Sequence, residues 1–239
     1  MATRHHRSLP ALALGFALPL LVGGTQGVLG APAPQAPSAA APASAPAAAP
    51  APSLPPLPAL DKVLFARLRN GALHAETVEM AGDVEDASKG AVRGYGVCLC
   101  AMEVLWEVLT DHSQFAEFVP RVKRMEISRR TATGERALQT IDATLKTLRY
   151  GLDYVWDPAL RRIDFKLAED IPHDLRAVKG RWQLWPLGDG KQVLMEYQSA
   201  VDVGTAVPGF IRSYLADRGV KDTLDAVRKR AEGLGPRQK

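Results

Sequence analysis

The sequence predicts an α+β domain in which a curved antiparallel sheet wraps around a long C-terminal helix, with two short helices after the first strand. Three observations support this prediction. The chain ends in a helix-like run at 205–231, six preceding segments repeat apolar residues with a period of two, and short turns join those segments. Short turns make consecutive strands antiparallel, with one apolar and one polar face. The sheet buries its apolar face by curling over the terminal helix.

Residues 1–30 have the pattern of a secretory signal peptide. Arg4 and Arg7 precede an apolar core at 9–22, and small residues follow at 29–31. The core is short for a membrane span, which favours a cleaved signal peptide. An uncleaved N-terminal anchor is the alternative. We therefore expect an exported protein, periplasmic or secreted.

Residues 31–59 form a proline- and alanine-rich tract without a charged residue. Such a segment has too little to bury to offset the entropy of ordering, so a disordered linker is predicted. It serves either as a tether or as a solubilising tail. The folded domain is then 60–234, and 235–239 is a flexible tail.

The charge of the mature protein argues against nucleic acid as a partner. The full chain carries a net charge of +4, and removing Arg4 and Arg7 leaves +2. A nucleic-acid footprint requires a much more basic face. Peripheral membrane contact stays open, and the sequence does not indicate an oligomeric state.

The elements before the sheet's main run are short. A helix is expected over Asp61–Gly71, followed by strands at Leu73–Met80 and Ala91–Cys100. Met102–Thr110 and His112–Val119 then read as two helices, the second capped by Asp111 and ended before Pro120.

Six strands follow in succession. Their alternation is clearest at 148–156, where the residues that share one face are Leu148, Tyr150, Leu152, Tyr154 and Trp156, and those between them are Arg149, Gly151, Asp153 and Val155. The expected strands are Val122–Arg130, Glu135–Leu145, Leu148–Trp156, Leu160–Leu167, Asp174–Leu187 and Gln192–Val203.

The terminal helix is predicted to begin at Thr205, which can cap it, with Pro208 in its first turn. Its apolar residues form two stripes that change near Gly219, a poor residue for the middle of a helix. The helix therefore either wraps a curved sheet or covers a cavity with its first half.

No residue set predicts a metal, a nucleophile or a cofactor. Cys98 and Cys100 are two apart on a strand, poorly placed to bridge each other, and are expected to be small buried residues. His112 is expected to face solvent at a helix start, and His173 to lie in a loop. The chain has no GxSxG, phosphate-loop or dinucleotide motif.

Three stretches resemble one superfamily. The run VLWEVLTDHSQFAEFVPRV at 104–122 is similar to the signature of the START-like (SRPBCC, helix-grip) proteins. Asp174–Gly190 and Val207–Glu232 resemble the closing hairpin and C-terminal helix of its polyketide cyclase/coenzyme Q-binding branch. The resemblance implies a helix-grip fold over 60–234. The superfamily includes lipid and sterol carriers, quinone-binding proteins and aromatase/cyclases, so the fold does not select one activity.

The sequence thus predicts binding of a hydrophobic small molecule (a lipid, an isoprenoid or quinone, or a polyketide-like compound) between sheet and helix, without catalysis. The expected ligand-binding residues are Gln139, Ile141, Tyr150, Leu152, Tyr154, Phe165, Trp182, Met195, Tyr197, Ser199, Phe210, Ile211 and Tyr214. Two alternatives remain: a cyclase or aromatase that uses Tyr150 and Tyr154 as proton relays, and an interaction module with a filled core.

Overall fold

The computed structural model describes residues 53–78, 91–143, 146–203 and 209–234; the side chains of 209–217 are not described. The predicted signal peptide, residues 31–52 of the predicted linker and the tail at 235–239 lie outside this part of the chain. So do Thr205 and Pro208. None of the described helices is long and apolar enough to cross a membrane.

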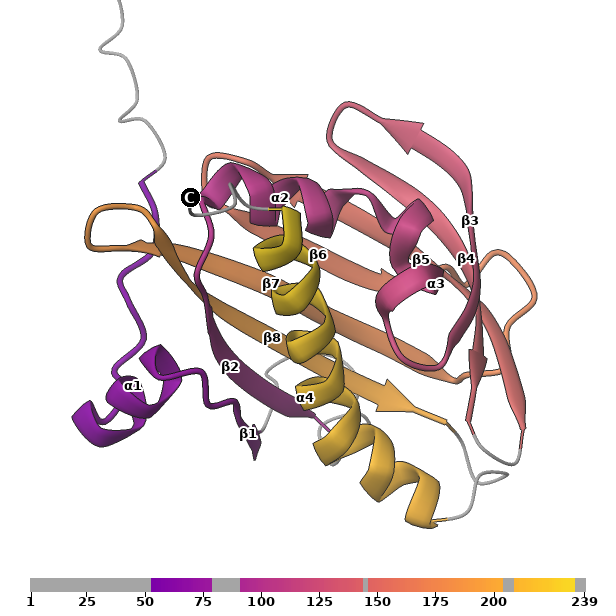
Figure 1. Cartoon of the computed structure of the whole chain (residues 1–239). Helices are drawn as coiled ribbons and strands as arrows, with labels where there is room; N and C mark the ends of the chain where they lie inside the picture. Colours follow the sequence, from indigo (N-terminus) through magenta and orange to yellow (C-terminus); the bar gives the residue numbers. More distant parts are fainter. Residues whose placement is uncertain (1–52, 79–90, 144–145, 204–208, 235–239) are drawn as a thin grey trace, which may run out of the picture. The chain divides into compact units, whose positions relative to one another are not determined.

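An eight-stranded antiparallel sheet forms the body of the domain, in the order β1-β2-β8-β7-β6-β5-β4-β3 (Figure 1). The six strands from β3 onward are each bonded to the next in sequence, and β2 pairs with the last strand, β8. The strands are β1 (His74–Thr77), β2 (Val92–Cys98), β3 (Val122–Thr131), β4 (Gly134–Asp142), β5 (Thr147–Asp157), β6 (Arg162–Leu167), β7 (Ala177–Leu187) and β8 (Gln192–Asp202). The predicted fold class and strand succession are confirmed, with ends shifted by a few residues.

The helices are α1 (Lys62–Arg69), α2 (Met102–Thr110), α3 (Phe115–Phe118) and α4 (Gly209–Leu234). α2 has the predicted bounds. The predicted helix at His112–Val119 is instead a 3₁₀ turn, η2 (His112–Gln114), followed by the single turn of α3. Residues three apart eclipse each other in a 3₁₀ turn, so His112 and Phe115 point the same way.

α4 crosses one face of the sheet, which we call the inner face (Figure 1). The second predicted stripe of α4 is buried at Val220, Leu224, Val227 and Ala231. Gly94 of β2 is what lets the helix approach: a Cβ there would lie 2.4 Å from Val220 Cγ1 and 2.7 Å from Leu224 Cδ1. The sequence interpretation, a bend in the sheet, missed this close contact between helix and strand.

Strict alternation predicted a uniformly polar outer face, opposite the inner one. The outer face instead carries apolar residues as well. Where β2, β8 and β7 run together, α1 and the segment before it cover a second apolar cluster. Its buried members are Leu68, Tyr95, Val97, Trp185, Leu187 and Leu194. The indole Nε1–H of Trp185 donates to the carbonyl oxygen of Pro55, 2.9 Å away. Contacts of the domain therefore begin before Leu60, inside the predicted linker.

The two cysteines were wrongly predicted to be unpaired. Cys98 and Cys100 form a disulfide, and both residues are buried. β2 ends at Cys98, and the chain bends at the next two residues. The bend brings the two Cα atoms to 5.4 Å, whereas residues two apart in an extended strand are separated by about 6.7 Å.

Candidate functional site

The strands bring the predicted ligand-binding residues of the sheet onto the inner face. Leu152, Tyr154, Phe165, Trp182 and Met195 are buried there. The register places Gln139 opposite Tyr150, and Ser199 opposite Gly180. Gln139 is buried, and Ile141, Tyr150, Tyr197 and Ser199 are half-buried. Phe210, Ile211 and Tyr214 belong to α4, but their side chains lie outside those that the structure describes.

Aromatic rings form a continuous row across this face. Ring centroids are 5.7 Å apart between Tyr154 and Phe165, 5.9 Å between Phe165 and Tyr197, and 4.4 Å between Tyr197 and Trp182. The row crosses β7 at Gly180, where a Cβ would lie 2.3 Å from the ring of Phe165. The glycine therefore creates the space through which Phe165 reaches Tyr197. Stacked and tilted pairs at these distances stabilise the fold beyond the area that they bury.

The row ends at a buried histidine, which sequence reasoning assigned to solvent. The side chains of His112 and Glu135 are both fully buried, and Nδ1 of His112 lies 2.6 Å from Glu135 Oε1. The imidazole centroid is 3.7 Å from that of Tyr154 and 4.6 Å from that of Phe115. In the turn of η2 the side chain of His112 points to the same side as that of Phe115, which is buried. The imidazole therefore points into the core and not to solvent.

Glu135 is held from its other side by Arg130. Nε and Nη2 of Arg130 lie 2.7 and 2.6 Å from Glu135 Oε2. The three side chains come from η2, β4 and β3, so only the folded chain assembles them. A signal was present in the sequence: Glu135 continues the inner-facing series of Ala137 and Gln139, where a charged residue is unusual.

Burial changes the protonation chemistry of this region. It raises the pKa of the Tyr150, Tyr154 and Tyr197 hydroxyls, so phenolates do not form near neutral pH. Burial also lowers the pKa of His112, although Glu135 opposes that effect. The tyrosines can therefore donate hydrogen bonds, whereas the neutral imidazole is the better base.

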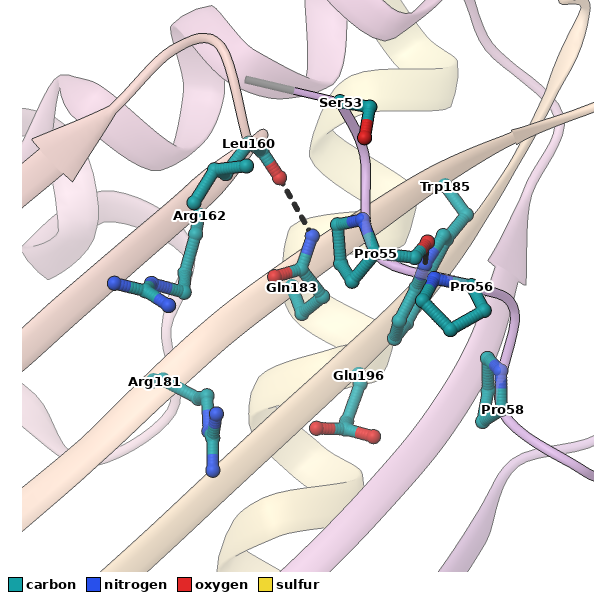
Figure 2. Close-up of a pocket in the computed structure, with 10 residues that line it drawn as sticks. All are labelled: Ser53, Pro55, Pro56, Pro58, Leu160, Arg162, Arg181, Gln183, Trp185 and Glu196. Carbon is teal, nitrogen blue, oxygen red and sulfur yellow. Dashed lines mark hydrogen bonds between the residues drawn. The ribbon is translucent and has the colours of Figure 1, made fainter. Parts of the chain in front are cut away.

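A pocket of about 250 Å³ lies on the outer face, away from the predicted site (Figure 2). Pro55 and Trp185 form one side, and Leu160, whose carbonyl accepts a 2.7 Å hydrogen bond from Gln183, forms another. The two arginines that line the pocket both contact polar side chains. Nε of Arg181 donates a hydrogen bond to Oε1 of Gln198 at 3.1 Å. Arg162 Nε lies 2.7 Å from Asp164 without pointing its N–H at that oxygen.

Comparisons with known proteins agree on the fold. Residues 101–228, more than half of the chain, match the family described as polyketide cyclase / dehydrase and lipid transport. The chain belongs to this family. No curated protein sequence matches significantly. Within the described residues, no group of three or more His, Cys, Asp or Glu side chains is placed to hold a metal ion.

Solved structures with the same fold have low sequence identity. A protein from Thermus thermophilus superposes with a TM-score of 0.54 at 18% identity, over 61% of this chain and 99% of its own. The Zhui aromatase/cyclase from a Streptomyces species gives 0.53 at 20%, over 61% and 98%. A STAR-related lipid transfer protein from Xanthomonas axonopodis gives 0.53 at 19%, over 65% and 99%. These similarities establish a START-like fold.

Proposed function

We propose that this protein binds a hydrophobic small molecule, a lipid, isoprenoid or polyketide-like compound, between the inner face of the sheet and α4. The observation that carries the proposal is the row of rings from Tyr154 to Trp182, together with the half-buried residues Tyr150 and Ser199 on the same face, each of which carries a hydroxyl. Membership of a family that includes lipid transport supports it. An apolar surface with a few polar groups is the usual composition of a small-molecule site.

The energetics allow binding without chemistry. Covering about 400 Å² of apolar ligand surface at about 25 cal/mol/Å² contributes roughly 10 kcal/mol before the costs of association. Those costs are about 4 kcal/mol or more, which leaves roughly 6 kcal/mol, equivalent to a Kd of tens of micromolar.

Analysis of what co-purifies with the protein tests the proposal. Native mass spectrometry of the chain from cells should show an added mass, and extraction should release an apolar molecule. A matched pair of variants locates the site. Ser199→Phe places a ring on the inner face and should reduce the bound fraction at least tenfold, whereas Lys179→Phe, on an exposed outer position, should leave it unchanged. An empty wild-type protein that also takes up nothing from a lipid panel would contradict the proposal.

A second candidate function is cyclisation of a polyketide-like chain at the same place. The observation that favours it is the imidazole of His112, held by Glu135 and lying 3.7 Å from the ring of Tyr154. A base there could remove a proton between two carbonyls, so that a carbon–carbon bond forms at a distant carbonyl and water leaves. Mass analysis for loss of water from a linear poly-β-ketone thioester tests it. Unchanged turnover in the Tyr150→Phe/Tyr154→Phe double variant would remove the tyrosine relay.

We also propose that the chain is exported. Residues 1–30 have signal-peptide character, and the Cys98–Cys100 disulfide suits an oxidising compartment. Intact-mass measurement of the protein in membrane, periplasmic and secreted fractions should find a chain shortened by about 30 residues. Recovery of the full-length chain in the cytoplasm would contradict export.

A further inference from the structure

The imidazole of His112 has one nitrogen that the described residues do not use. Nδ1 is paired with Glu135, whereas Nε2 is buried and has no hydrogen-bond partner in the part of the chain that the structure describes. Buried polar atoms in native proteins are nearly always paired, because an unpaired one loses its hydration without compensation. A molecule on the inner face that bonds to Nε2 would remove this cost.

The ion pair with Arg130 determines which hydrogen bond Nε2 can make. Nε and Nη2 of Arg130 lie 2.7 and 2.6 Å from Glu135 Oε2, which is the geometry of an ion pair, and a carboxylate in such a pair only accepts hydrogen bonds. The proton between Glu135 and His112 must therefore be on Nδ1. Burial lowers the pKa of His112, so the ring is neutral near pH 7 and Nε2 carries a lone pair. The free nitrogen is an acceptor, and its partner must be a donor.

A second buried nitrogen without a hydrogen-bond partner among the described residues lies on the inner face, on β5, the strand that carries Tyr154. Trp156 is two residues beyond Tyr154 on β5, and its buried indole Nε1 has no hydrogen-bond partner among the described residues. Its N–H is a donor. This end of the inner face therefore presents one free acceptor and one free donor, the two roles that a hydroxyl group can fill.

We propose that Nε2 of His112 accepts a hydrogen bond from a hydroxyl group of the hydrophobic ligand. The site then selects phenols and alcohols over ethers and hydrocarbons of the same shape. Glu135 acts as a positioning residue that fixes the tautomer. This inference rests on the proposed function and names the chemical class of its ligand.

Two matched probes test the selection: 1-naphthol and 1-methoxynaphthalene, which share the same ring system. Calorimetric titration of the full chain should give about tenfold tighter binding of the naphthol. His112→Phe keeps a ring against Tyr154 and should equalise the two affinities. Glu135→Gln, whose amide no longer fixes the proton on Nδ1, should reduce the preference. His173→Asn, in a loop, should retain it.

Nitrogen-15 NMR of histidine-labelled wild-type protein reads the tautomer even if a variant fails to fold. Nδ1 of His112 should carry the proton, and the Nε2 signal should move on adding 1-naphthol but not its ether. A proton on Nε2 in the free protein would overturn the inference. Equal binding of both probes to wild type would also overturn it while leaving the proposed function intact. Binding of neither probe would contradict the proposed function for aromatic ligands, and the inference with it.

Discussion

The two faces of one sheet are stabilised in different ways. Close apolar packing stabilises the inner face. There α4 approaches β2 so closely at Gly94 that no side chain fits, and aromatic rings cover β5 to β8. The outer face combines the apolar cluster beneath α1 with directed polar contacts, such as Arg136 with Asp153 and Trp185 with Pro55. Within the described residues, the buried side-chain nitrogens without a hydrogen-bond partner are Nε2 of His112 and Nε1 of Trp156 on the inner face, and Nε of Arg162 on the outer face. A ligand bound on the inner face, as proposed above, would satisfy the first two of these nitrogens.

The largest effect should come from Gly94→Val. The added atoms overlap Val220 and Leu224, so α4 must move away from the sheet. We expect a loss of more than about 3 kcal/mol in the free energy of unfolding, measured by urea denaturation, together with loss of ligand binding. Gly233→Ala is the control, because no described residue comes within 4 Å of a Cβ placed there and alanine favours a helix. A Gly94→Val protein of wild-type stability would show that α4 does not depend on this contact.

Asp153→Asn should produce the next largest effect, on the outer face. Its carboxylate accepts hydrogen bonds from Nε and Nη2 of Arg136, both at 2.7 Å, and these bonds lower its pKa. The substitution should cost about 2 kcal/mol at pH 7. Because the folded pKa is depressed, this stability is present above the unfolded pKa of about 4 and is lost as the pH falls through the folded value.

Asp170→Asn is the matched control for this prediction. Asp170 also bonds to Arg136, but its side chain is 68% exposed, so solvent screens the pair and little stability should be lost. Ligand binding should be unchanged in both variants. An equal loss for Asp153→Asn and Asp170→Asn would show that burial of the pair does not matter.

Trp185→Phe should cost less, about 1 kcal/mol. It removes the hydrogen bond to the carbonyl of Pro55 and keeps an aromatic ring in the outer cluster. Thermal unfolding measures the loss, and limited proteolysis should cleave more readily near Pro55. Probe affinity on the inner face should not change. A change in affinity would show that the two faces are coupled.

The smallest effect concerns the pH dependence of His112. The ring faces Glu135, Arg130, Asp111 and Tyr154, and burial lowers its pKa. Below pH about 6.5 the unfolded chain binds a proton that the folded chain excludes, so stability falls as the pH falls from 7 to 5. His112→Gln should flatten this slope in urea titrations at each pH. An unchanged slope would place the titrating group elsewhere.

Local patterns in the sequence determined much of the architecture. The period-two alternation from Leu148 to Trp156 identified the inner-facing residues of β5, because successive side chains of a strand point to opposite faces. Met102–Thr110 was predicted with its observed bounds, because apolar residues at helical spacing define it. The resemblance of three stretches led to the family that residues 101–228 match.

Only the tertiary structure decided the features that depend on distant residues. No local pattern brings His112 to Glu135 and Arg130, since a turn and two strands must fold together before the imidazole is buried and its Nε2 is left without a partner among the described residues. The docking of Pro55 on Trp185 joins residues 130 apart in the chain. Periodicity reports which face a residue occupies, but not what lies opposite that face. That depends on packing between elements, which a linear pattern does not contain.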